Sequence, residues 1–168
     1  KVTAANLSEY VRHLPDDCPW VVMPTLETAE VFDTQDLRQI RQQLRAIQER
    51  VLMLRIGGND LLHQLGMRRP KSGTIYDTPL DTAICRLVQM FKPDGYHLSA
   101  PVFEMVDRME LLEEEVEQDL AHGLTCKTAI HPSQIAVIES WYSVPHQDAE
   151  QAEAILDPSA PAVFRLHG

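Results

Sequence analysis

The chain has 168 residues, of which 44% are apolar, and it carries a formal net charge of −10 with an isoelectric point near 5.0. This size and apolar content suit one globular domain with its own core. The acidic balance argues against nonspecific binding to nucleic acid or to anionic membranes, because both favour basic surfaces. No apolar run is long enough to span a bilayer, so we expect no membrane partner.

The predicted elements alternate between helix and strand along the chain. Apolar runs predict strands at 20–26, 51–57, 96–102 and 124–130, and 3.6-residue periodicity with capping signals predicts the helices. In the first half of the chain the predicted helices are a short one at 6–14, one capped by Asp33 or Thr34, and a short one at 59–65. In the second half they are one that starts at Thr78-Pro79, an acidic one with a capping box at Asp107 and Glu110, one that begins at Pro132, and one at 147–156. Regular alternation implies an α/β fold with a parallel sheet of four strands.

Glu27 and Asp60 each follow a predicted buried strand. The carboxyl ends of parallel strands are where ligands and catalytic groups collect, and two carboxylates there suit a hard cation such as Mg²⁺. Gly57 and Gly58 precede Asp60 and would let the backbone approach a ligand closely. The alternatives are ordinary: Glu27 as an acid at a helix terminus and Asp60 as a helix cap.

Four further features have both a functional and a structural interpretation. His131 beside Pro132 is either a site residue or a helix cap, and His97 is more typical of a core or rim residue. The basic loop Arg68–Lys71 either binds a phosphate or carboxylate or is simply solvated. Glu104 is a possible third acid at the same edge as Glu27, whereas the run Glu113–Glu115 is expected to be a solvated helix face.

Cysteine usage offers no recognisable framework. Cys18, Cys85 and Cys126 are widely spaced and odd in number, which fits neither a zinc motif nor a set of disulfides. A reducing cytoplasm is therefore the default expectation for localisation. Because the first residue is lysine, we expect a processed product or part of a longer chain.

Four motifs, taken in order, resemble the citrate lyase beta subunit and the HpcH/HpaI aldolase family. They are LeuGluThrAla (26–29), IleGlyGlyAsnAspLeuLeuHisGlnLeuGly (56–66), SerAlaProValPheGlu (99–104) and GlyLeuThrCysLysThrAlaIleHisProSerGlnIleAlaVal (123–137). The last is the most specific, since about nine of its positions agree in order with the family's eighth-strand motif. Asn59 stands where the family has Glu, Cys126 stands where it has Gly, and 67–77 is unlike the family's loop.

The resemblance implies a (β/α)₈ TIM barrel of the phosphoenolpyruvate/pyruvate type, present here as a partial barrel of about four parallel strands with flanking helices. Lys1-Val2 resembles the end of the family's fourth strand. We therefore expect residues 1–168 to form a single domain, the C-terminal half of the barrel with strands five to eight.

The resemblance also implies a Mg²⁺-dependent carbon–carbon lyase or aldolase acting on a 2-oxo acid or an acyl-coenzyme A substrate, so coenzyme A itself is an open part of the prediction. Glu27 and Asp60 would be the metal ligands, and no general base is assigned. The implied substrate-binding residues are Gly57, Gly58, Asn59, Lys127, His131 and Gln134. An isolated half barrel is expected to be inactive and to self-associate, which predicts a homo-oligomer.

Two other function classes stay open. One is a non-catalytic binding or regulatory module that kept the barrel and lost the chemistry. The other is a phosphotransfer enzyme of the wider phosphoenolpyruvate/pyruvate group, for which Arg68, Arg69 and Lys71 would be the phosphate ligands.

Overall fold

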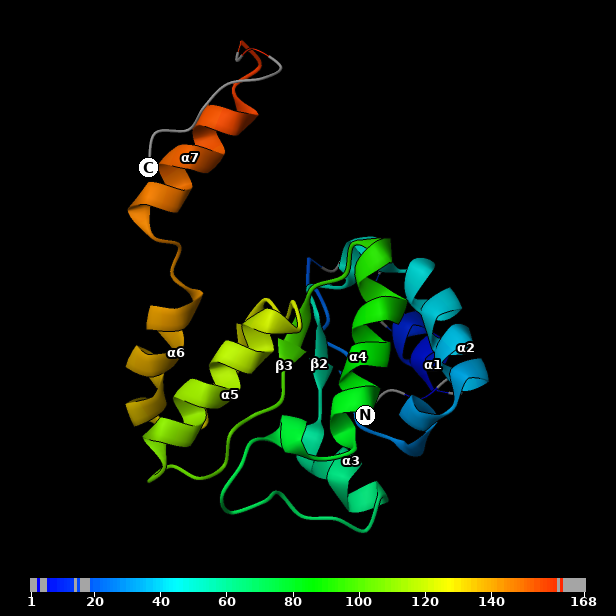
Figure 1. Ribbon diagram of the computed structural model, residues 1–168. Helices are drawn as coiled ribbons and strands as arrows, with labels where there is room; N and C mark the ends of the chain where they lie inside the picture. The colour runs from blue at the N-terminus through cyan, green and yellow to red at the C-terminus, as the bar shows by residue number, and fades with distance from the viewer. Residues whose placement is uncertain (1–2, 4–5, 14, 16–18, 160, 162–168) are drawn as a thin grey trace.

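The computed structural model describes residues 3, 6–13, 15, 19–159 and 161 (Figure 1). Lys1-Val2 and Cys18, which the sequence analysis singled out, lie outside the described residues. The strands are β1 (Thr25–Leu26), β2 (Leu54–Ile56), β3 (Leu98–Ala100) and β4 (Cys126–Lys127). The α-helices are α1 (Leu7–Arg12), α2 (Thr34–Arg45), α3 (Gly58–Gln64), α4 (Leu80–Phe91), α5 (Met109–Ala121), α6 (Ile135–Tyr142) and α7 (His146–Leu156). Short 3₁₀ turns are η1 (Ala29–Phe32), η2 (Gln48–Arg50), η3 (Ile75–Asp77), η4 (Lys92–Asp94) and η5 (Pro132–Gln134).

The four strands form one parallel sheet in the order β1-β2-β3-β4, so each strand pairs with the next one along the chain. This confirms the predicted strand count and the predicted parallel arrangement. Leu26 lies opposite Ile56, and Ala100 lies opposite Lys127, so the strands end at a common level. The register therefore brings the segments that follow the strands to one edge of the sheet.

The regular strands are shorter than the apolar runs that predicted them, and prolines explain part of this difference. The 20–26 segment does run along β2, because the amides of Leu52 and Arg55 donate to the carbonyls of Val22 and Pro24. Pro24 itself has no amide hydrogen to add to the ladder, and Pro101 likewise follows the last residue of β3.

Of two helix starts predicted from capping residues, the structure confirms one and contradicts the other. Asp33 caps α2, as predicted, and its carboxylate accepts from the amides of Gln35 and Asp36. The capping box predicted at Asp107 and Glu110 is wrong, because α5 begins after Arg108 and the Arg108 guanidinium binds Glu110. A true capping box occurs instead at Thr74 and Asp77, where it fixes η3.

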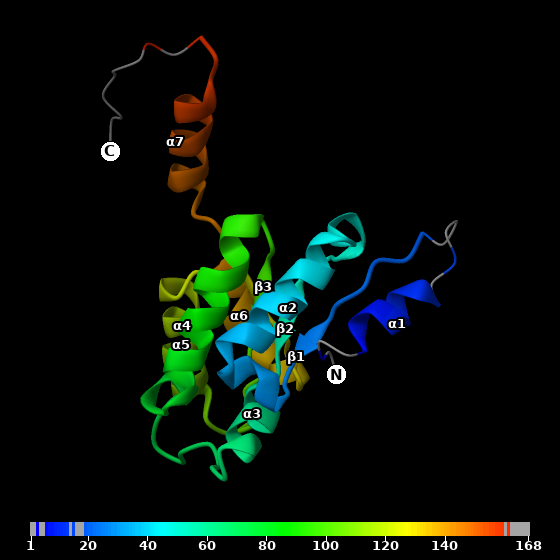
Figure 2. The ribbon, with the colours of Figure 1, turned by 90° about the vertical axis from the view of Figure 1, so that its right-hand side faces the viewer.

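Two apolar clusters hold the helices to the sheet. The larger joins β1–β3 to α1–α4 through residues such as Leu26, Leu44 and Leu98, and the smaller joins α5 to α6 around Phe103 and Ile138. In Figure 1, α1, α2 and α4 lie to the right of β2 and β3, while α5 and α6 lie to their left. Figures 1 and 2 both show α7 projecting away from the rest, and α7 has no buried residues. No helix in the described part of the chain is long and apolar enough to cross a membrane.

Asp94 joins η4 to α2 and should make stability fall in acid. Its carboxylate accepts two hydrogen bonds each from Arg41 and Arg45, and these guanidinium groups hold the pKa of Asp94 well below its ordinary value. A depressed pKa means that the folded state favours the carboxylate. The stabilisation is therefore fully present above about pH 4 and is lost as the pH falls below it.

Thermal melting of the native protein and of Asp94→Asn between pH 7 and pH 3 tests this linkage. We expect the difference in Tm between them to be largest at neutral pH and to shrink in acid. Asp107→Asn, which alters an exposed acid, is the control. A difference in Tm that stays constant over this range would contradict the assignment.

Candidate functional site

Glu27 and Asp60 both follow strands at the carboxyl edge of the sheet. Glu27 directly follows β1, and Asp60 lies in the first turn of α3, which follows β2 after Gly57. Since Leu26 pairs with Ile56, Glu27 and Gly57 leave their strands side by side. The structure thus brings both residues to one edge, as the sequence indicated, while their role as metal ligands stays a prediction.

The glycine pair is sterically required here. A Cβ built on Gly57 would lie 2.5 Å from Oε2 of Glu27, so the carboxylate lies directly against the glycine backbone. A Cβ on Gly58 would lie 2.6 Å from Cδ1 of Ile75 and 2.7 Å from Cβ of Pro101. Gly57 therefore sets the position of the Glu27 side chain, and Gly58 lets the loop 67–77 close over the start of α3.

Asn59 connects this edge to the segment after β3. Its amide nitrogen donates to Oε2 of Glu104, while its Oδ1 is buried without a hydrogen-bond partner. An unpartnered buried oxygen is costly unless a ligand or ion satisfies it. Glu27, Asp60 and Glu104 thus come from the segments after β1, β2 and β3, and the oxygen ligands that they and Asn59 offer are of the type that Mg²⁺ requires.

Lys127 lies at the end of β4, but its ammonium points into a buried ion network. Nζ is 2.9 Å from Oε1 of Glu115 and 2.9 Å from Oδ2 of Asp119, and all three side chains are fully buried. Burial raises the pKa of the Asp119 carboxyl, with Lys127 acting in the opposite direction. In this structure Lys127 therefore ties β4 to α5, and its charge is already satisfied by the protein.

The network also holds the loop that precedes α4. Arg69 forms an ion pair with Glu115 and donates to the carbonyl of Val102 at 2.8 Å, and the amide of Ile75 donates to Glu115 at 3.0 Å. The prediction that Glu113–Glu115 is a solvated face is therefore wrong for Glu115, because two cations from elsewhere in the chain enclose it. Its i, i+4 spacing with Asp119 was the sequence signal for a shared helix face.

The remaining predicted site residues are His131 and Gln134, and His97 is the other histidine that the sequence singled out. His131 is exposed and caps η5 by accepting from the amide of Ser133. Gln134 is fully buried, donates to the carbonyl of Phe103 and accepts from the amide of Ile130, so it braces the loop after β4. His97 is exposed at the start of β3.

A groove lies away from these residues. It has a volume of about 630 Å³ and runs between α1 and the 21–25 segment, lined by residues such as Tyr10, His13 and Met23. The predicted site residues are not among the described residues given for its lining. The strand ends, where convergent polar groups meet, are the better candidate for the chemistry.

The family assignment rests on a match over the whole sequence. The profile of the family described as C–C bond lyase of the TIM-barrel fold matches residues 1–168. The chain belongs to this lyase family. The family supplies the barrel architecture, and the parallel β1–β4 order found here is the order that consecutive strands take in such a barrel. The predicted fold class, a partial TIM barrel of four parallel strands, is confirmed.

Relatives of this member of the TIM-barrel lyase family include one curated sequence and several solved structures. A citrate lyase subunit beta-like protein of Deinococcus radiodurans is 26% identical over 153 residues, covering 89% of this chain and 49% of that protein. RipC from Yersinia pestis gives a TM-score of 0.69 at 21% identity, over 89% of this chain and 63% of RipC. CitE from Mycobacterium tuberculosis, solved with magnesium, acetoacetate and coenzyme A, gives 0.67 at 22% identity, over 99% of this chain and 58% of CitE.

A further structure of the Mycobacterium tuberculosis citrate lyase beta subunit, with oxaloacetate and magnesium, gives a TM-score of 0.64 at 23% identity and covers 84% of this chain and 58% of that one. The chain thus spans about half the length of the curated relative it matches. At these identities the solved structures establish the shared fold.

Proposed function

We propose that the protein containing this chain is a Mg²⁺-dependent carbon–carbon bond lyase that acts on a 2-oxo acid or an acyl-coenzyme A type substrate. The observation that carries the proposal is the placement of Glu27 and Asp60 after two neighbouring parallel strands. Support comes from the relatives, since solved CitE structures hold magnesium with acetoacetate and coenzyme A, or with oxaloacetate.

Each residue at the edge has a defined part in this proposal. Glu27 and Asp60 would hold Mg²⁺, and waters would complete its coordination, since Mg²⁺ retains several. Bound Mg²⁺ would polarise the substrate carbonyl and stabilise enolate charge. The lack of a side chain at Gly57 leaves room for the Glu27 side chain, and Oδ1 of Asn59 offers an acceptor to a water or to the substrate.

The predicted substrate-binding residues after β4 differ in their exposure to solvent. His131 is exposed and can contact substrate, whereas Lys127 and Gln134 are buried and would act by holding β4, α5 and the following loop in place. We assign no general base within the described residues. We further propose that residues 1–168 form the second half of a barrel, strands five to eight, that the other strands complete the site, and that the protein assembles as a homo-oligomer.

The phosphotransfer alternative loses part of its support. A phosphate-binding role for Arg68, Arg69 and Lys71 would favour it, but the Arg69 guanidinium is buried against Glu115 and the carbonyl of Val102. A carbon–carbon lyase also agrees with the family match.

Calorimetric titration of Mg²⁺ into the protein, with and without oxaloacetate, tests the assignment. We expect oxaloacetate to strengthen Mg²⁺ binding. Glu27→Gln and Asp60→Asn should each weaken binding by more than the roughly 10–100-fold that loss of an outer-shell partner costs. The exposed acid at Asp107 provides the control Asp107→Asn, which should bind as the native protein does. Native Mg²⁺ affinity in folded Glu27→Gln would refute the site.

A further inference from the structure

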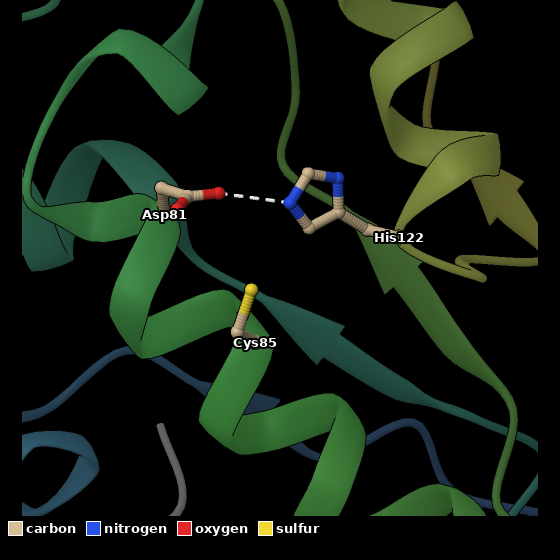
Figure 3. Close-up of side chains that lie close together, drawn as sticks. All are labelled: Asp81, Cys85 and His122. Carbon is tan, nitrogen blue, oxygen red and sulfur yellow. Dashed lines mark hydrogen bonds and ion pairs between the residues drawn. The ribbon is translucent and has the colours of Figure 1, made fainter.

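A second group of metal-type donors lies away from the strand ends. Asp81 and Cys85 are four residues apart on α4, and His122 follows the last residue of α5 (Figure 3). One donor atom from each residue lies within 4.8 Å of the other two, and this is the one group of three such donors within the described part of the chain. The i, i+4 spacing puts Asp81 and Cys85 on the same face of α4, toward His122.

The imidazole of His122 is already oriented for metal binding. Nδ1 is 2.7 Å from the carbonyl oxygen of Gln118, and because a carbonyl can only accept, Nδ1 carries the hydrogen. Nε2 lies 2.8 Å from Oδ1 of Asp81, so one hydrogen is shared between these two atoms, and a bound cation would take the place of that hydrogen. Metal-ligating histidines characteristically donate their other ring N–H to a carbonyl or carboxylate in this way.

A second contact fixes the plane of the ring. Tyr76 stacks on His122 with ring centroids 4.3 Å apart, and the Tyr76 hydroxyl donates to Asp119 at 2.5 Å. Figure 3 shows the His122 ring directed at the side chains of Asp81 and Cys85. The histidine is thus held by three separate interactions, which lowers the entropy cost of recruiting it as a ligand.

We propose that Asp81, Cys85 and His122 bind a divalent transition-metal ion of the zinc class, clipping α4 to the end of α5. Thiolate, imidazole and carboxylate are the ligands that Zn²⁺ prefers, whereas Mg²⁺ requires oxygen. Three protein ligands leave a fourth position for water. Zinc bonds of about 2.0–2.3 Å put donors roughly 3–4 Å apart in a tetrahedron, so modest side-chain rotations complete the site.

The solvent exposure and the charge of the Asp81, Cys85 and His122 group both favour binding of a cation from solvent. The side chains of Asp81 and His122 are 40% and 22% exposed. The carboxylate of Asp81 places negative charge beside the Cys85 thiol, and a bound cation would replace the thiol proton. This site uses none of the residues proposed for Mg²⁺, so the two proposals stand independently.

Titration with Co²⁺, a spectroscopic substitute for Zn²⁺, tests the proposal directly. We expect a thiolate-to-cobalt charge-transfer band and visible bands typical of four-coordinate Co²⁺, with Zn²⁺ displacing both. Cys85→Ser should abolish the charge-transfer band, and His122→Gln should weaken Co²⁺ binding at least about tenfold. Asp81→Asn is a second ligand variant should Cys85→Ser fail to fold, and circular dichroism verifies folding.

Matched controls separate this site from the rest of the molecule. Cys126→Ser removes a thiol that contacts Met53, and His97→Gln removes an exposed imidazole, so neither should change the bands. Glu27→Gln should also retain them, whether or not the Mg²⁺ proposal holds. Absence of the bands in the native protein, or their persistence in Cys85→Ser, would overturn the proposal and leave Asp81 and His122 as an interhelical ion pair only.

Discussion

Glu115→Gln is expected to lower the free energy of unfolding by about 3–5 kcal/mol, the usual cost of removing one member of a buried ion pair. Glu115 is fully buried and accepts from Arg69, Lys127 and the amide of Ile75. Glutamine keeps the shape and some hydrogen bonding, but it leaves Lys127 with Asp119 as its carboxylate partner and leaves the Arg69 guanidinium with the carbonyl of Val102. Chemical denaturation monitored by circular dichroism measures the loss.

Two comparisons make the test specific. Glu114→Gln changes an exposed neighbour on α5 and should stay within about 0.5 kcal/mol of the native protein. The double variant Arg69→Met/Glu115→Met removes both charges of one pair, so it should cost less than Glu115→Met and Arg69→Met added together. If Glu115→Gln lowers the free energy of unfolding by less than about 1 kcal/mol, the ion network of Glu115, Arg69 and Lys127 is hydrated and not buried.

The buried ion network around Glu115 also supports the proposed Mg²⁺ site. Glu115 holds the Ile75 amide, and Ile75 packs against Gly58 at the start of α3. Releasing that loop should disorder the turn that carries Asn59 and Asp60. We therefore expect Glu115→Gln to weaken Mg²⁺ binding under conditions where the protein remains folded, even though Glu115 is not a proposed ligand.

Gly57→Ala is expected to weaken Mg²⁺ binding by about 10–100-fold, as loss of an outer-shell contact does. The φ angle of Gly57 is −86°, so alanine is compatible with the backbone torsion there. The added methyl group would instead overlap Cβ of Glu27 and lie 2.5 Å from Oε2 of the same side chain, so both the backbone at Glu27 and its carboxylate must shift. Overpacking of this kind also costs about 1–3 kcal/mol of stability. Calorimetry with Mg²⁺ and thermal melting measure the two effects separately.

Glu114→Gln, an exposed change on α5, is the control for this prediction. It should leave both the stability and the Mg²⁺ affinity close to those of the native protein. Equal Mg²⁺ affinity in Gly57→Ala and the native protein would mean that Glu27 does not bind the metal from the position described here.

Local sequence patterns determined the order of elements and the place of the candidate Mg²⁺ site. The apolar runs marked all four strands, Asp33 marked the start of α2, and Glu27 and Asp60 were visible as acids that follow strands. These features depend on periodicity and on neighbours a few residues apart, which a linear sequence displays directly. The motif resemblance to the lyase barrel added the fold, and the family match agrees with it.

Only the tertiary structure decided which charged side chains are buried and which distant groups meet. Lys127 resembled a site residue and Glu115 a solvated one, yet they pair with each other because α5 packs behind β4. Asp81 and His122 are 41 residues apart, and nothing local predicts their contact. Burial and long-range pairing depend on how helices pack on the sheet, and the period of a single helix specifies its apolar face but not its partner.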